Sequence, residues 1–131
     1  MILVDANIPM YLVGADHPNK FRAAAAVERA VGDGDRLVTD AEVLQEILHR
    51  FTAIERPEAI GLAFDVLLAV VEETLPIDVV DVHAAKDVLA GGYRLSARDA
   101  LHVAVMARHG IDSVMSLHGG FDRYPGLRRV S

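Results

Sequence analysis

The sequence predicts an α/β fold built on a mainly parallel sheet. Short runs of strand character alternate with longer segments of helical periodicity along the whole chain, a pattern typical of strand–helix–strand units. No internal repeat, low-complexity tract or linker interrupts this pattern. The 131 residues therefore fit one compact domain that spans residues 1–131.

The chain begins with a predicted buried strand, Ile2–Val4. A short helix, Ile8–Val13, follows, with a proline in its first turn, where a missing N–H costs nothing. Phe21–Val31 is rich in alanine and ends at a Gly-Asp-Gly sequence, which predicts a second helix. Arg36–Val38 is the second predicted strand.

Two helices are predicted between the second and third strands. Thr39 and Glu42 form a potential capping box, in which Thr39 is the N-cap and Glu42 reaches back to it. The helix that follows carries four apolar residues at helical spacing: Leu44, Ile47, Leu48 and Phe51. Glu58–Val71 follows a proline, and its apolar second half predicts deep packing.

The rest of the chain repeats the alternation. Thr74–Val80 contains a proline, so we expect an edge strand there. Val82–Ala90 is helical and ends at two glycines. Ser96 and Asp99 form a second potential capping box before the helix Ala100–Arg108. Three segments complete the chain: the strand Ser113–Ser116, the loop Leu117–Pro125 and the short strand Leu127–Val130.

Composition narrows the class of protein. Hydrophobic residues make up 52% of the chain, but no apolar run approaches the roughly 18 residues of a membrane-spanning helix. We see no signal-peptide pattern, and cysteine is absent, which fits a cytoplasmic protein. The net charge is −6, from 13 basic and 19 acidic residues. Any binding to nucleic acid should therefore depend on a local groove, a metal or a dimer surface.

Three carboxylates stand where a solvated charge is not the obvious choice. Asp5 ends the first strand, and ligands of open α/β sheets bind beyond the carboxyl ends of the strands. Glu46 and Asp99 lie on apolar helical patterns. Carboxylates that converge repel one another and are held together by a cation. A divalent metal site is the economical explanation.

Each of these residues also has a simpler interpretation. Asp5 could cap the turn into the next helix, and Asp99 could serve only the second capping box. Glu46 could be a solvated helical charge. His102, one turn after Asp99, is interpreted as a partly buried packing residue. The three tyrosines are too scattered along the chain to suggest a base-stacking platform.

Taken together, the motifs resemble the PIN-domain family and, within it, the VapC-type toxins of toxin–antitoxin pairs. The resemblance rests on segments in a fixed order: Val4–Asn7, Val43–Arg50, Ser96–Ala104, Ser116 and Phe121–Leu127. It implies a PIN-like three-layer sandwich, with a mainly parallel sheet of four or five strands flanked by helices. It also implies an endoribonuclease that depends on Mg²⁺ or Mn²⁺, a VapB-like antitoxin that blocks the acidic pocket, and a homodimer.

We assign Asp5 and Asp99 as the primary metal ligands and Glu46 as a group that binds through water, orients the nucleophile or holds a second metal. Asn7 could donate a hydrogen bond to a ligand water or a phosphate. Many PIN relatives carry an acid or Asn two positions after the Ser or Thr of the last motif. Here Ser116 is followed at that position by His118, and the next acid is Asp122, so the fourth acid is either missing or replaced.

Two other functions compete with a metal-dependent ribonuclease. A phosphohydrolase with Asp5 as nucleophile, like the haloacid dehalogenase group, needs a second Asp where this chain has Asn7. A catalytically weak PIN domain that binds a partner or RNA is the other alternative, favoured by His118 and by the low pI of about 5.4. Sequence alone identifies neither the RNA nor the number of metal ions.

Overall fold

A computed structural model describes all 131 residues, Met1–Ser131. Five short strands form one sheet: β1 Ile2–Val4, β2 Leu37–Asp40, β3 Glu73–Leu75, β4 Ser113–Met115 and β5 Arg128–Val130. Six α-helices and one 3₁₀ helix connect them: α1 Asn7–Val13, α2 Pro18–Gly32, α3 Ala41–Ala53, α4 Glu58–Val70, α5 Val79–Ala90, α6 Ala97–Arg108 and η1 Gly119–Arg123. None of the helices has the length and apolarity needed to span a bilayer.

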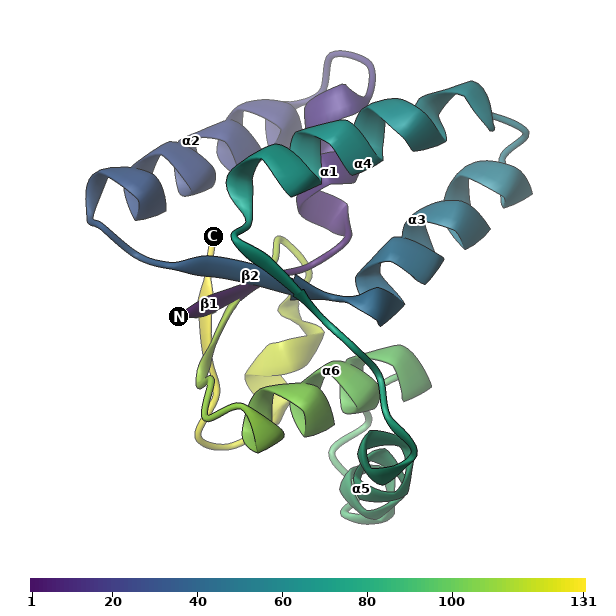
Figure 1. The fold of residues 1–131 in the computed structure, drawn as a ribbon, viewed down its shortest axis with the longest axis vertical. Coiled ribbons are helices and arrows are strands. Elements are labelled where there is room, and N and C mark those ends of the chain that lie inside the picture. Colours follow the sequence, from purple (N-terminus) through teal and green to yellow (C-terminus); the bar gives the residue numbers. More distant parts are fainter.

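The sheet has the strand order β3-β2-β1-β4-β5, and every neighbouring pair is parallel. Figure 1 shows α1, α2 and α4 on one face of the sheet and α5 and α6 on the other, which makes three layers. The predicted fold class is therefore confirmed. The Pro76-containing segment does form an edge strand, although β3 is shorter than predicted and Val79 and Val80 already belong to α5.

The central strand, β1, is the most deeply buried part of the sheet. Ile2, Leu3 and Val4 are at most 2% exposed and belong to a core of 25 buried apolar residues. Because β1 pairs with β2 on one side and β4 on the other, the residues after all three strands meet at one edge. This edge carries the candidate site.

Two local predictions about helix starts need correction. The N-cap of α3 is Asp40, not Thr39: the Asp40 carboxylate accepts from the Val43 N–H, whereas the Thr39 hydroxyl donates to the Val4 carbonyl and ties β2 to β1. Thr39 remains in the strand because the sheet already uses its side chain. Ser96 does cap α6, but the reciprocal bond of a capping box forms instead at α5, between Asp78 and Asp81.

The loop predicted over residues 117–125 contains the 3₁₀ helix η1. Phe121 of this helix is fully buried and belongs to the core. The buried Phe121 side chain anchors η1 against the sheet. The position of this segment beside the site is therefore set by packing, which a search for helical or strand periodicity does not detect.

Candidate functional site

Asp5 lies at the carboxyl end of β1 and is only 4% exposed. One carboxylate oxygen, Oδ1, accepts from the Ala6 N–H at 2.8 Å. The other, Oδ2, accepts from the Ser116 hydroxyl at 2.8 Å and from the Asn7 side-chain amide at 3.1 Å. The carboxylate is therefore held in one orientation by groups from two neighbouring parts of the fold.

Asn7 and Ser116 also bind each other, with the Asn7 amide donating to the Ser116 hydroxyl at 2.9 Å. The Asn7 side-chain carbonyl accepts from the Leu117 N–H at 3.1 Å, so Asn7 joins the start of α1 to the segment after β4. Both residues were singled out in the sequence. In the structure they orient Asp5, and Asn7 also lines the pocket.

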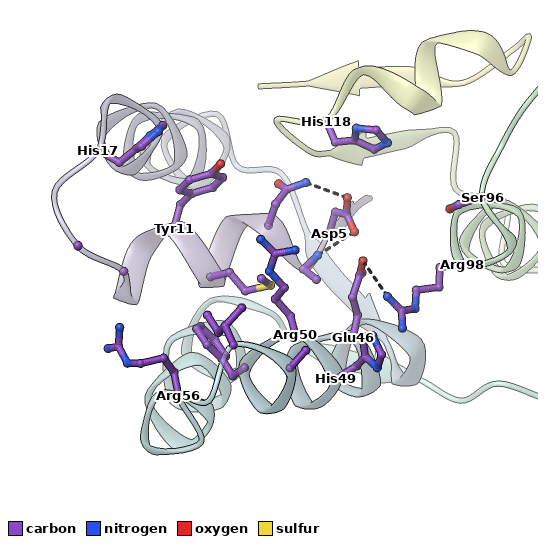
Figure 2. A pocket seen from close by; sticks show the side chains of 18 of the residues that line it. Asp5, Tyr11, His17, Glu46, His49, Arg50, Arg56, Ser96, Arg98 and His118 are labelled. Carbon is purple, nitrogen blue, oxygen red and sulfur yellow. Dashed lines mark hydrogen bonds and ion pairs between the residues drawn. The ribbon is translucent and has the colours of Figure 1, made fainter.

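Glu46 reaches the same place from α3, with 28% of its side chain exposed. Burial raises the pKa of Glu46 above its usual value, and the Asp5 carboxylate raises it further. Arg98 of α6 lies 3.9 Å from Glu46 and 3.6 Å from Glu42, which partly offsets this charge. Figure 2 shows Glu46 and Arg98 next to each other at the pocket, joined by this contact. Glu46 is therefore not a freely solvated helical charge.

Asp99 occupies the third position of α6. Its backbone N–H donates to the Ser96 hydroxyl at 3.1 Å, so the backbone serves the cap while the carboxylate faces the pocket. Burial raises the pKa of Asp99, and the Asp5 carboxylate raises it further. His118 Nε2 lies 3.5 Å from Asp99 Oδ2. Asp99 therefore has two roles: its backbone takes part in the N-terminal cap of α6, and its carboxylate belongs to the acidic cluster.

His102 is completely buried, and its Nδ1 lies 2.7 Å from Asp40 Oδ2. Its other ring nitrogen, Nε2, has no hydrogen-bond partner and lies 3.9 Å from Asp5 Oδ1. Burial lowers the pKa of His102, but Asp40 and, more weakly, Asp5 and Glu46 raise it to about 9 overall. The interpretation of His102 as a partly buried packing residue is wrong: it is a buried polar group bonded to a carboxylate.

One pocket of about 710 Å³ contains the three predicted acids, Asp5, Glu46 and Asp99. The side-chain ligand atoms of Asp5, Glu46 and His102 all lie within 4.8 Å of one another, and Asp99 lies outside this tight group. Hard divalent cations such as Mg²⁺ prefer carboxylate oxygens. The Asp5 carboxylate raises the pKa of both Glu46 and Asp99, a repulsion that a bound cation would relieve. The residues present therefore fit a divalent cation.

The structure separates the two residues considered as substitutes for a fourth acid. His118 lines the pocket, with 58% of its side chain exposed. Asp122 does not line it. Its carboxylate pairs with Arg129 through bonds of 2.9 and 3.1 Å, and Arg129 also donates to the Ser116 carbonyl. Asp122 therefore links η1 to β5 through Arg129 and lies outside the acidic cluster.

Sequence reasoning missed Asp40 as a residue of this site. The apolar run before it predicts the strand, but no local pattern shows that Asp40 meets His102, 62 positions further along. A buried His in register with Asp99 on α6 was the available signal. Its partner is visible only once β2 and α6 are placed side by side.

A PIN-domain family model matches residues 2–127. The chain belongs to the PIN-domain family. This membership removes the support for the phosphohydrolase alternative, which required a different arrangement of acids.

Within the family, the chain is similar to VapC proteins of mycobacteria. It is 60% identical to ribonuclease VapC13 of Mycobacterium tuberculosis over 131 residues, which cover 100% of both chains. It is 36% identical to ribonuclease VapC23 of the same species over 114 residues, or 87% of this chain and 90% of VapC23.

Solved structures share the fold at lower identity. VapC20 of Mycobacterium tuberculosis, a toxin that cleaves the sarcin–ricin loop, superposes with a TM-score of 0.80 at 20% identity and full coverage of both chains. VapBC2 of Rickettsia felis, solved with a promoter DNA fragment, gives a TM-score of 0.72 at 15% identity, covering 98% of this chain and 97% of that one. These likenesses show the PIN fold.

Proposed function

We propose that this PIN-domain protein is a metal-dependent endoribonuclease, the toxin of a VapBC-type toxin–antitoxin pair. The observation that carries the proposal is the convergence of Asp5, Glu46 and Asp99 in one pocket, from β1, α3 and α6. The 60% identity to ribonuclease VapC13, across the whole of both chains, supports the choice of RNA as the substrate.

Mg²⁺ or Mn²⁺ is the proposed cofactor, with Asp5 as its central ligand and Asp99 and Glu46 as flanking ligands, directly or through water. When bound, the cation would supply a Lewis acid that stabilises charge on the attacked phosphodiester. His102 has a pKa of about 9 and carries a proton on both ring nitrogens at neutral pH. We therefore assign it to offsetting the charge of Asp5, which lies 3.9 Å from its Nε2, rather than to binding metal.

The remaining groups act on orientation. Asn7 and Ser116 fix the Asp5 carboxylate through three mutual hydrogen bonds. Glu46, with its raised pKa, faces the centre of the pocket and is proposed to orient the attacking water. Arg98 holds Glu46 at the pocket wall. In this scheme the chain supplies a preorganised negative site, and the substrate phosphate enters opposite the acids.

A VapB-like antitoxin is the proposed protein partner, and a homodimer the proposed assembly. Structures that share this fold include a toxin–antitoxin complex from Klebsiella pneumoniae, with a TM-score of 0.64 at 16% identity. VapBC of Salmonella typhimurium, solved bound to DNA, shares it with a TM-score of 0.70. An antitoxin that places a basic side chain in the acidic pocket would block the site. A toxin acting on cellular RNA would work in the cytoplasm.

The proposal is tested with the purified chain and structured RNAs, including transfer RNA and a ribosomal RNA fragment, in Mg²⁺, Mn²⁺ or EDTA. We expect cleavage that requires metal and is lost in Asp5→Asn and Asp99→Asn. Asp122→Asn is the matched control, because it removes an exposed carboxylate that lies outside the pocket. Cleavage that persists in EDTA, or that survives Asp5→Asn, would refute the proposal.

A catalytically weak PIN domain that binds RNA or a partner remains the second candidate. The observation that favours it is His118, which lines the pocket where many relatives carry an acid. A histidine in place of this acid removes a negative charge from the pocket and disfavours a tightly held second metal ion. RNA binding without cleavage in any of the metals would support this function over the first.

A further inference from the structure

The pocket extends well beyond its acids. Its far wall is made by α1, by the segment between α1 and α2, and by the second half of α3. A scissile phosphate beside the acids fills only part of a volume of about 710 Å³. The residues of the far wall are therefore placed to contact a neighbouring part of the same substrate.

Two aromatic rings line this wall. Tyr11 of α1 and His17, just before α2, have ring centroids 5.3 Å apart and are tilted by 34°. His17 Nδ1 accepts from the Asn19 N–H at 3.0 Å and caps α2, which fixes the ring. Figure 2 shows the pair on the side of the pocket opposite Ser96 and Arg98. This aromatic pair was not predicted from the sequence, because the search for a base-stacking platform considered tyrosines and the second ring belongs to a histidine.

An arginine without a carboxylate partner stands next to this pair. Arg50 follows Glu46 by one turn of α3, and both side chains line the pocket. The other two arginines there are paired, Arg56 with Glu58 and Arg98 with Glu42 and Glu46. In Figure 2 the Arg50 guanidinium is directed into the pocket, between Tyr11 and Glu46 in that view. A free guanidinium at this position is suited to a phosphate.

We propose that Tyr11, His17 and Arg50 form a subsite for the unpaired nucleotide next to the scissile phosphate. The base stacks on the aromatic pair, and Arg50 contacts the phosphate of that nucleotide. Proteins that recognise RNA sequence-specifically read splayed, single-stranded bases on aromatic platforms, whereas base-paired RNA offers no free base face. The subsite therefore selects RNA that is single-stranded beside the cleaved bond.

This inference rests on the proposed function for the choice of RNA as ligand, but it is tested without catalysis. Binding of a fluorescein-labelled single-stranded octaribonucleotide is measured by anisotropy in EDTA, against an RNA duplex of the same length. We expect the single strand to bind more tightly. We expect Tyr11→Leu to weaken its binding roughly five- to hundredfold, as for loss of one stacked base.

The variants are chosen to separate stacking from folding. Tyr11→Phe keeps the ring and should retain binding. His17→Asn keeps a side chain that can cap α2 but removes the ring, and should weaken binding like Tyr11→Leu. Tyr93→Leu is the matched control, because Tyr93 packs edge-to-face against Tyr124 and does not line the pocket. If Tyr11→Phe loses as much affinity as Tyr11→Leu, stacking is not the cause and the subsite is refuted.

The charge of Arg50 is tested by salt dependence. Arg50→Gln should reduce the slope of log K against log salt concentration by about one, as for loss of one phosphate contact. Arg22→Gln, which removes an arginine of α2 outside the pocket, should leave that slope unchanged. An unlabelled acidic peptide that competes as strongly as the oligonucleotide would assign this wall to a protein partner and overturn the proposal. Failure of the cleavage assay with intact binding would instead reject only the nuclease function.

Discussion

The buried pair between Asp40 and His102 allows a quantitative test of how this site is held together. Both side chains are 0% exposed, and the atoms Asp40 Oδ2 and His102 Nδ1 are 2.7 Å apart. We therefore choose Asp40→Asn, which removes the charge but keeps an oxygen that can accept from the Val43 N–H at the start of α3. The variant separates the ion pair from the helix cap.

The expected cost follows from the pKa of His102, which is raised from 6.5 to about 9, with Asp40 as the largest raising cause. One unit of pKa corresponds to about 1.4 kcal/mol, so burial, Asp40, Asp5 and Glu46 together favour the charged form of His102 by a net of roughly 3 kcal/mol, and Asp40 is the main favourable group. Breaking a buried ion pair by removing one partner typically costs about 3–5 kcal/mol, which agrees. For a chain of 131 residues this lowers Tm by roughly 10 °C.

The pH dependence has a definite sign. Because folding raises the pKa of His102, its stabilisation is fully present below pH 6.5 and is lost as pH rises through about 9. Urea unfolding in EDTA, followed by circular dichroism, should therefore show a large difference between wild type and Asp40→Asn at pH 6.5. Most of this difference should disappear at pH 9.5.

The matched control is Asp65→Asn, an exposed carboxylate of α4, which should change stability by no more than about 0.5 kcal/mol at either pH. Two results would refute the reasoning. One is a cost of Asp40→Asn below about 1 kcal/mol. The other is a cost that stays the same from pH 6.5 to pH 9.5, since that would assign the effect to packing or to the cap.

Asp99→Asn keeps the backbone bond to Ser96 and relieves repulsion in the pocket. We therefore expect a free energy of unfolding within about 1 kcal/mol of wild type, together with loss of RNA cleavage. A urea titration that shows a loss of stability above about 2 kcal/mol would favour a purely structural role. Asp81→Asn, measured the same way, should cost about 1–3 kcal/mol, because the hydrogen bond from Arg108 lowers the pKa of the buried Asp81. That cost is present at neutral pH and is lost progressively as pH falls from about 4 through the lowered pKa of Asp81, while cleavage per folded molecule stays at the wild-type level. Gly120→Ala places a Cβ 2.5 Å from His118 Nε2, so the exposed ring must move; its imidazole NMR signals should shift while Tm changes little, and unchanged signals would contradict the geometry.

Much of the fold could be predicted from local patterns. Apolar strands and amphipathic helices can be recognised from their periodicities. The edge position of the third strand was also predicted correctly, from Pro76, which directly follows β3 in the structure. Helix starts were less predictable. Thr39 and Asp40 are both good caps, and the choice between them depends on the Val4 carbonyl, which lies 35 positions away and occupies the Thr39 hydroxyl.

The candidate site, too, was predictable from the sequence only in part. The sequence determined which acids are unusual, because Asp5 follows a buried strand and Glu46 and Asp99 interrupt apolar helical patterns. Only the tertiary structure decided which other groups join them. It excluded Asp122, which pairs with Arg129, and it brought Asp40 against His102 and His17 against Tyr11. The physical reason is that a residue's own periodicity determines which face of its element it occupies, whereas the group it meets there depends on packing between elements distant along the chain.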